Sequence, residues 1–343
     1  MAQSARAGAV RDRRLMKEPT LRIAADFEPH ANTVMSFAVH REWGSDRESV
    51  EDELEEVIRA IAEDEPVTLL TPPDLLGAVR SRGLPPEVEI VPAPVDDIWM
   101  RDIAPVFAHG PDGIVAIDLN FNGWDNSWRR PSRPGDRLAR IFDFDVPVVS
   151  ASFVGEGGAI LSDGRGLAIA TRSCLLARNP HLTEADLSAA LAALGLGTIL
   201  WLDGDRKEPI TSGHPDGYLA FLPDGGLLVE TIDHGVGHRG RRRDVMALRQ
   251  AYANGLVGEL RYVAGPGERW LEVAHDLFAA TYVNLFVTRR QVITARFDDP
   301  FGDAAAERTL AACFPGRRIR MLEITAILRG GGGVRCLTQP VPA

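Results

Sequence analysis

The chain has 343 residues, of which 45% are hydrophobic and 25% charged, a composition typical of folded globular proteins rather than disordered or fibrous ones. It carries 48 acidic and 38 basic residues, for a formal charge of −10, which disfavours nucleic acids and anionic membranes as partners and would help to attract a cation. Three cysteines without a C-x-x-C pair predict neither a disulfide framework nor a thiolate zinc site.

Residues 1–20 mix basic and acidic side chains and contain no apolar run of signal-peptide length. We therefore expect a disordered leader over 1–20 and a single large domain over 21–343. No segment reaches the roughly 18 apolar residues that span a bilayer, so we expect no membrane anchor. The odd number of cysteines fits a reducing cytosol, so we expect a cytoplasmic protein.

Helices and strands alternate along the chain. An amphipathic helix is predicted over 48–65, with apolar residues at 50, 54, 57, 58 and 61 on one face, and a strand follows at 67–70. Thr183 caps a second helix, Gly195 ends it, and a buried strand follows at 198–202. Further helices are predicted over 244–253 and 303–314, and short strands over 88–91, 148–153, 167–170, 226–229 and 291–294. This alternation indicates an α/β fold.

Single polar residues interrupt the pattern at similar intervals. They are Asp102, Glu156, His214, Asn284 and Cys336, separated by 54, 58, 70 and 52 residues. Each interval is about the length of one small β/α unit, and side chains at the same phase of a closed repeat converge on its axis. The spacing predicts five units around a common centre.

Cys336 is the candidate nucleophile. Four glycines, at positions 330–333, precede it and allow close backbone approach to a ligand. Its neighbour Arg335 is expected to lower the thiol pKa if the two side chains meet. Cys313 lies in an apolar helical segment and Cys174 is expected at a packed strand or turn position, so neither is given a role.

His214 and the carboxylates complete the candidate site. His214 and Asp216 are two residues apart and face one pocket if the segment is extended. Asp102 and Glu156 emerge from apolar neighbours, so each must pair with a structural arginine, such as Arg101, or wait for a ligand cation. Carboxylates suit a guanidinium, because two planar groups share paired charge-assisted hydrogen bonds.

A metal site is the weaker interpretation of these groups. His234 and His238 could join His214 and Asp216 as ligands, but the arginines that follow oppose a bound metal. We expect no metal and no organic cofactor.

The chain resembles the agmatine deiminase and bacterial peptidyl-arginine deiminase family of the pentein fold. The resemblance runs from about residue 26 to 339 and is carried by FEPHANTVMSF, DDIWMRDIAP, FNGW, GEGGAILSDG, TRSCLLARNPHLT, TSGHPDG, YVNLF and GGGGVRCLTQ, in that order. It implies a five-bladed α/β propeller with the site on its axis.

By motif match, the resemblance implies that Cys336 attacks the guanidinium carbon and that Asp102 and Glu156 hold its nitrogens. His214 then protonates the departing ammonia and activates water, while Asp216 binds the cation or orients the imidazole. The same motifs supply the other substrate-binding candidates, which are Asp96, Trp99, Gly332, Gly333 and Arg335.

The expected reaction is hydrolysis of agmatine to N-carbamoylputrescine and ammonia, a step of putrescine synthesis. Ser212, Arg335 and the pair Phe37 and Ala38 depart from the usual agmatine deiminase pattern, so free arginine, peptidyl-arginine or another guanidino compound stays open as substrate. The sequence is also compatible with an amidinotransferase, in which an amine captures the intermediate, and with a non-catalytic binding protein. A small guanidino cation is the expected partner, and a homodimer is possible.

Overall fold

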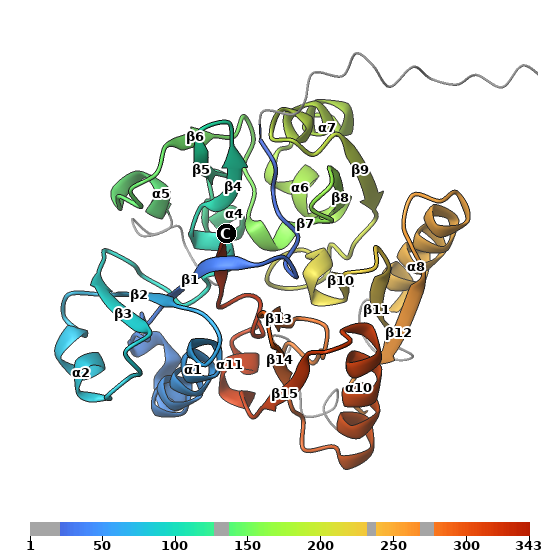
Figure 1. Ribbon diagram of the computed structural model, residues 1–343. Helices are drawn as coiled ribbons and strands as arrows, with labels where there is room; N and C mark the ends of the chain where they lie inside the picture. Colours follow the sequence, from blue (N-terminus) through green and yellow to red (C-terminus); the bar gives the residue numbers. More distant parts are fainter. Residues whose placement is uncertain (1–20, 127–136, 232–237, 268–277) are drawn as a thin grey trace, which may run out of the picture.

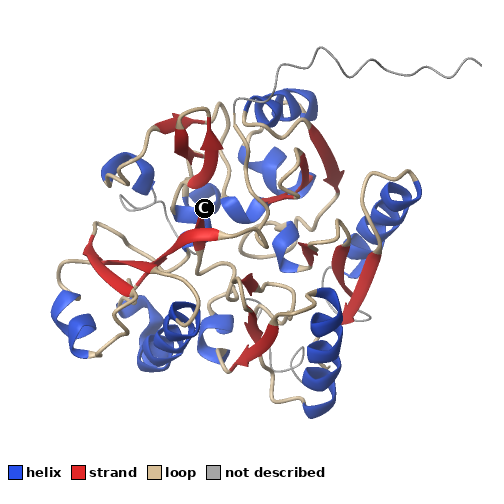
Figure 2. Cartoon of the chain, viewed as in Figure 1, coloured by secondary structure: helices blue, strands red, loops and turns tan. Residues whose placement is uncertain are grey.

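The computed structural model describes residues 21–126, 137–231, 238–267 and 278–343 (Figure 1). The leader expected over 1–20 lies outside these ranges. The described chain forms a mixed α/β fold with five small sheets, and the helices α1 (Arg47–Ala62), α7 (Glu184–Ala193), α8 (His238–Ala253) and α10 (Pro300–Cys313) lie at the periphery (Figures 1 and 2).

Four of the sheets have three strands each and share one topology. The first and second strands of each sheet are antiparallel, and the third is parallel to the second. The sheets are β4 (Val106–Gly110), β5 (Gly113–Asp118) and β6 (Val148–Ser150); β7 (Ile160–Ser162), β8 (Leu167–Thr171) and β9 (Thr198–Leu202); β10 (Leu219–Phe221), β11 (Leu227–Thr231) and β12 (Leu260–Ala264); and β13 (Phe286–Val287), β14 (Gln291–Ala295) and β15 (Arg318–Leu322).

The fifth sheet joins the two ends of the described chain. Its order is β16 (Gln339–Pro342), β1 (His30–Ser36), β2 (Val67–Thr71) and β3 (Val88–Pro92). β16 is antiparallel to β1, and β1 is parallel to β2, so the first three strands repeat the topology of the other sheets. The C-terminal strand thereby supplies the strand that the N-terminal unit lacks.

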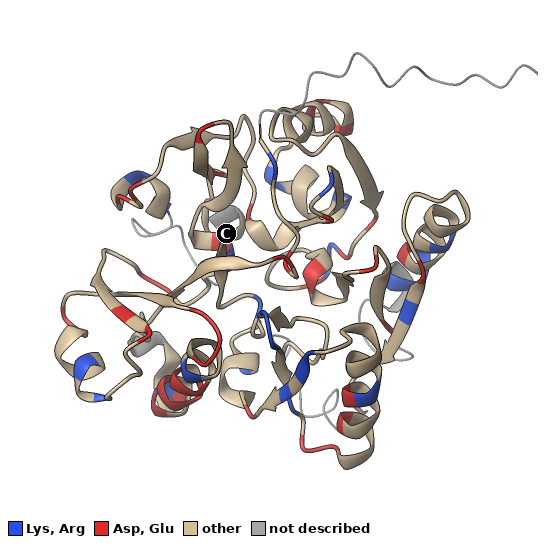
Figure 3. Cartoon of the chain, viewed as in Figure 1, with Lys and Arg blue, Asp and Glu red and all other residues tan. Residues whose placement is uncertain are grey.

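A helix connects the two parallel strands in most of these units, as a parallel crossover requires. In α1 the predicted apolar face is buried, because Val50, Leu54, Val57, Ile58 and Ile61 are fully covered. The outer face of α1 is strongly acidic (Figure 3). Thr183 caps α7 through a reciprocal capping box with Asp186, which confirms the predicted start of that helix.

The remaining helices are short. They are α2 (Leu76–Ser81), α3 (Met100–Ile103), α4 (Gly123–Asn126), α5 (Leu138–Ile141), α6 (Arg172–Arg178) and α11 (Thr325–Arg329), with 3₁₀ turns η2 (Arg41–Asp46), η4 (Gly157–Ala159) and η5 (Pro215–Gly217). None of the helices in the described part of the chain is both long and apolar enough to cross a membrane.

Three local expectations differ from the structure. The helix expected over 244–253 begins at His238, as α8. Cys174 lies on α6 and not on a strand or turn. The sequence does not predict this helix, because seven residues are too few to show a helical period. The strand expected over 148–153 ends at Ser150, where the chain leaves the sheet toward Glu156. Cys313 is buried on α10, as predicted.

Candidate active site

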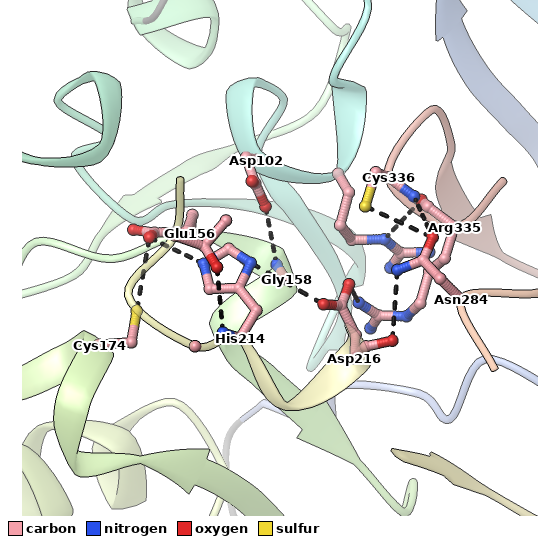
Figure 4. Close-up of polar contacts among 12 residues, drawn as sticks. Asp102, Glu156, Gly158, Cys174, His214, Asp216, Asn284, Arg335 and Cys336 are labelled. Atoms are coloured by element: carbon pink, nitrogen blue, oxygen red, sulfur yellow. Dashed lines mark hydrogen bonds and ion pairs between the residues drawn. The ribbon is translucent and has the colours of Figure 1, made fainter. Parts of the chain in front are cut away.

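The five polar residues that recur in the sequence occupy the same place in successive units. Each lies just before the first strand of a sheet: Asp102 before β4, Glu156 before β7, His214 before β10, Asn284 before β13 and Cys336 before β16. The predicted phase of the repeat is therefore confirmed. Figure 4 shows the five side chains in one cluster, with Asp102 and Asp216 between the imidazole and the thiol in that view.

Within the described residues, Asp102 is held by neutral donors and not by an arginine. The backbone N–H of Gly158 donates to Oδ1 at 2.9 Å, and the indole Nε1 of Trp124 donates to Oδ2 at 3.0 Å. Burial raises the pKa of Asp102, partly opposed by the charge of His214. Arg101, which the sequence offered as a structural ion-pair partner of Asp102, contacts Asp26 instead. Asp102 is therefore available to a cationic ligand.

Gly158 is required by this close packing. A Cβ atom at this position would lie 2.5 Å from Nδ1 of His214 and 2.9 Å from Oδ1 of Asp102. Because real Cβ contacts are longer than this, any side chain at residue 158 would separate the carboxylate from the imidazole.

Glu156 is fully buried and forms an ion pair with Arg178. Its Oε1 accepts from Nη2 of Arg178 at 2.7 Å and from Nε at 3.1 Å, and lies 2.9 Å from Nε2 of His214. Burial opposes the charge of Glu156, but Arg178 and His214 overcome this effect and lower its pKa to about 2. Glu156 therefore stays ionised and orients the imidazole.

His214 lies between Glu156 and Asp216. Its Nδ1 is 3.8 Å from Oδ1 of Asp216, a looser contact than the one to Glu156. Burial disfavours a charged imidazole, but the negative charge of Asp102 and the contacts with Cys174 and Glu156 raise the pKa of His214 well above its ordinary value. The site thus contains a protonated imidazole that can act as an acid.

Asp216 forms a buried ion pair with Arg335. Nη1 of Arg335 donates to Oδ2 of Asp216 at 2.6 Å, and Nε donates to Asp26 at 2.8 Å. Nη1 of Arg101 lies 3.2 Å from the other oxygen of Asp26. Burial lowers the pKa of Arg335, but the charges of Asp26 and Asp216 outweigh it and keep the pKa above the ordinary value. Arg335, expected to contact substrate, is thus part of a buried ion-pair network.

Asn284 positions Cys336. Its Oδ1 lies 3.4 Å from Sγ of Cys336 and accepts from the backbone N–H of the same residue at 3.3 Å, while its Nδ2 donates to the carbonyl of Asp216. The sequence spacing singled out Asn284 without assigning it a role.

The expectation that Arg335 lowers the thiol pKa is wrong. Burial and the charges of Asp216 and Asp102 raise the pKa of Cys336 to about 12, because the Arg335 side chain turns toward Asp26 and Asp216. The thiol is protonated in the unliganded protein, and a cation bound beside these carboxylates would lower its pKa.

Three of the remaining substrate-binding candidates, Trp99, Gly332 and Gly333, lie near the nucleophile or the residue that positions it. Trp99 is nearly buried, and a Cβ on Gly332 would lie 2.4 Å from its ring, so the glycine allows the loop before Cys336 to pack on the indole. Gly333 lies against Asn284, and Asp96 is half-buried in the segment between β3 and α3.

A metal could be considered at one group of side chains. Glu156, Cys174 and His214 place one ligand atom each within 4.8 Å of one another. The guanidinium of Arg178 is bonded to the same Glu156 oxygen, and burial and Glu156 raise the pKa of Cys174 to about 11, so both charge and protonation oppose a cation there. His234 and the side chain of His238, considered as ligands from the sequence, lie outside the described residues.

Several residues of the site were missed in the sequence. Arg178 lies in the motif TRSCLLARNP and is buried. Nothing in the sequence pairs it with Glu156, so this contact could not be predicted. Asp26 and Trp124 also contact the site from distant parts of the chain.

The fold and the site together define an α/β protein with a cysteine-centred, negatively charged site. Five β/α units of one topology bring a thiol, a protonated imidazole and three carboxylates together, as expected of an α/β protein that binds a planar cation next to a cysteine.

Comparisons with known proteins agree with this class. Residues 22–342 match the sequence profile of Porphyromonas-type peptidyl-arginine deiminase. The chain is 30% identical to the agmatine deiminase of Ectopseudomonas mendocina, over 93% of this chain and 95% of that protein, and 29% identical to that of Pseudomonas aeruginosa, over 94% and 95%. A solved structure of the agmatine deiminase of Enterococcus faecalis superposes with a TM-score of 0.85 at 23% identity, covering 94% of this chain and 96% of that chain.

The chain therefore belongs to the agmatine deiminase and Porphyromonas-type peptidyl-arginine deiminase family.

Proposed function

We propose that this protein is a guanidine deiminase that works through a covalent thiouronium on Cys336, with agmatine as its substrate. The observation that carries the proposal is that two buried carboxylates, Asp102 and Asp216, lie close to both reactive groups. Both carboxylates raise the pKa of the Cys336 thiol, Asp102 also raises the pKa of His214, and Asp216 contacts the imidazole of His214. A guanidinium bound by these carboxylates would present its carbon to the sulfur and a nitrogen to the imidazole. The family membership and the names of the relatives support the same reaction.

The bound cation would itself prepare the nucleophile. Burial, together with the charges of Asp216 and Asp102, raises the pKa of the thiol. A positive charge bound between these carboxylates would offset their effect and stabilise the thiolate, so that the thiol gives its proton to solvent when substrate binds. The sulfur then forms a bond to the guanidinium carbon. The imidazolium of His214 donates its proton to the leaving nitrogen, which departs as ammonia when its bond to carbon breaks.

The second half of the reaction uses the same imidazole as a base. Neutral His214 takes a proton from water, whose oxygen forms a bond to the thiouronium carbon. The carbon–sulfur bond then breaks, the sulfur regains a proton from the tetrahedral species, and the ureido product leaves with the imidazole protonated again. The pair of bonds from Arg178 keeps Glu156 fixed, so that its contact with Nε2 orients the imidazole throughout.

We further propose that the five sheets are the blades of a five-bladed α/β propeller, the pentein architecture, with the site near its axis. The repeated strand order, the matching position of the five polar residues and the pairing of β16 with β1 support this arrangement. One polar side chain from the start of each sheet would then point to the centre.

Agmatine is favoured over substrates with a carboxylate tail by the contacts of Arg335. Its guanidinium is buried and bonded to Asp26 and Asp216, so its charge is used within the protein. Ser212, which departs from the usual pattern, has a positive φ of 61° and its carbonyl accepts from the hydroxyl of Ser173. Neither departure adds a free cation for a carboxylate to contact.

The proposed function is tested with a substrate panel. Purified protein is incubated with agmatine, free arginine and an arginine-containing peptide, and ammonia and ureido product are measured directly. We expect kcat/KM to be highest for agmatine, and Cys336→Ser to release no ammonia. Preference for arginine or the peptide would overturn the substrate assignment, and no turnover of any of the three would overturn the proposed activity.

A further inference from the structure

Asp26 reaches the site from the N-terminal segment that leads into β1. The backbone of this segment pairs with β4 through Arg22 and His109, and the hydroxyl of Ser162 in β7 donates to the carbonyl of residue 23. In Figure 1 the segment (blue) runs between β4 and β7 before it enters β1. It thereby brings the carboxylate of Asp26 next to two arginines of the catalytic cluster.

The carboxylate of Asp26 joins these two buried arginines. Its Oδ2 accepts from Nε of Arg335 at 2.8 Å, and its Oδ1 lies 3.2 Å from Nη1 of Arg101. The side chains of Arg335 and Arg101 are only 6% and 5% exposed. Burial and the neighbouring charge of Arg335 lower the pKa of Arg101 to about 10, and the charge of Asp26 opposes this effect. Asp26 therefore holds together two guanidiniums that repel each other.

Each of these arginines immediately precedes a residue of the proposed catalytic site. Arg101 is followed by Asp102, which would bind the substrate guanidinium, and the residue after Arg335 is the nucleophile. The two segments are also joined through their backbones. The N–H of Arg101 donates to the carbonyl of Cys336 at 3.0 Å, and Nε of Arg101 donates to the carbonyl of Arg335 at 3.4 Å. A displacement of either arginine would therefore move the carboxylate or the thiol next to it.

Arg101 also packs against the loop that carries Glu156. A Cβ atom on Gly157 would lie 2.3 Å from the carbonyl oxygen of Arg101 and 3.2 Å from Cδ of its side chain. This loop therefore lies in direct contact with the residue that Asp26 holds. The position of Arg101 is thus coupled to three segments of the site, which contain Asp102, Glu156 and Cys336.

We propose that Asp26 is a positioning residue that keeps Asp102 and Cys336 at a fixed separation. It acts through the two arginines that precede them and does not itself touch the substrate. The inference rests on the proposed function, because the separation matters for attack of the sulfur on a guanidinium held by the carboxylate. A misplacement of about 1 Å between reacting groups can lower a rate by about 100-fold.

The variant Asp26→Asn keeps the shape of the side chain but removes the charge between the arginines. We expect kcat for ammonia release from agmatine to fall by about 10- to 100-fold. The thiol faces Asp102, Asp216 and His214, whose charges stay in place, and the charge of Arg101 also acts on it. Because Asp26 no longer offsets Arg101, the pKa of the thiol should fall, and iodoacetamide should alkylate Cys336 about three- to tenfold faster at a given pH. Slower turnover with a more reactive thiol is not expected from a loss of stability alone.

Asp64→Asn provides a matched control. Asp64 is 1% exposed and accepts from Nε of Arg290 at 2.6 Å, so it also joins an arginine of a distant unit, but it makes no contact with the site within the described residues. This variant should leave kcat and the pH profile of alkylation unchanged. Circular dichroism shows that each variant is folded at the assay temperature.

Two outcomes would overturn the positioning role. They are a kcat of folded Asp26→Asn within about twofold of the wild-type value, and an alkylation profile that does not move. If Asp26→Asn fails to fold, Arg101→Lys decides the question, because it keeps the positive charge but cannot contact both Asp26 and the carbonyl of Arg335. A fall in its kcat of tenfold or more supports the role, and a kcat within about twofold of wild type refutes it.

Failure of the proposed function gives a different result. If the wild-type protein releases no ammonia from any guanidine, that function is wrong, but alkylation of Cys336 does not require turnover. The alkylation profile then decides alone: a faster reaction in Asp26→Asn than in Asp64→Asn shows that Asp26 acts on the nucleophile, and equal profiles refute it.

Discussion

Arg178 offers the sharpest test of the buried electrostatics of the site. Arg178→Met keeps the apolar stem but removes the two bonds to Glu156, at 2.7 and 3.1 Å, and the bond to the carbonyl of Thr211. The side chains of Arg178 and Glu156 are 1% and 0% exposed, so the buried carboxylate would keep only the contact with His214. Removing one partner of a buried ion pair costs about 3–5 kcal/mol, and we expect a loss of this size in the free energy of unfolding.

The helix that carries Arg178 provides its own control. Arg172 on α6 pairs with Glu184, but both side chains are about two-fifths exposed, so Arg172→Met should cost only about 0–1 kcal/mol. Urea unfolding followed by circular dichroism measures both values. Adding Glu156→Gln to Arg178→Met removes the stranded charge and should recover part of the lost stability, which a double-mutant cycle quantifies.

The pH dependence of this loss has a definite sign. In the wild-type protein the pKa of Glu156 is lowered to about 2, so its contribution to stability is present above pH 4.5 and disappears as pH falls toward 2. Without Arg178 the pKa of Glu156 rises, because only His214 then opposes the effect of burial, and protonation of the carboxylate relieves part of the cost. The deficit of Arg178→Met should therefore shrink as pH is lowered below the ordinary carboxyl range. A cost no larger than that of Arg172→Met, or a deficit that grows toward acid pH, would refute the assignment.

Three further predictions concern Cys336 and the residues that pack around it. Asn284→Ala removes the contacts that orient the thiol and should lower kcat by about 10- to 100-fold with little change in KM, measured by steady-state ammonia release; an unchanged kcat would contradict the positioning role. Gly332→Ala forces a Cβ to within 2.4 Å of the Trp99 ring and should destabilise the protein by about 1–3 kcal/mol in urea unfolding, whereas Gly77→Ala in α2, with open space around it, should not. Alkylation of Cys336 by iodoacetamide should rise with pH without levelling off below pH 10, since its pKa is raised to about 12, and a plateau near pH 8 would show that the thiol is not held in its protonated form.

The phase of the site could be predicted from sequence because it depends on a local rule repeated along the chain. Each polar residue precedes the first strand of its unit, and this order is preserved in the sequence as near-regular spacing. The apolar face of α1 is equally local, since residues three and four apart on a helix share a face.

The partners of these residues could not be predicted, because they are set by packing between distant units. Arg335 bonds to Asp26, 309 residues away in the chain, and not to its neighbour Cys336. Proximity in sequence therefore gave the wrong sign for the pKa of the thiol, which burial and Asp216 decide. The ion pair between Arg178 and Glu156 likewise depends on the packing of α6 beside the turn at η4, which the sequence does not reveal.

The proposed mechanism requires that Cys336 carries the substrate carbon during turnover. Mass spectrometry of the protein after acid quenching of a reaction with agmatine measures this directly. We expect a transient adduct on the peptide containing Cys336, with a mass increase equal to agmatine less ammonia, and no such adduct on Cys174 or Cys313. Release of ammonia by Cys336→Ala at the wild-type rate, with no adduct in either protein, would show that the sulfur takes no part in the reaction.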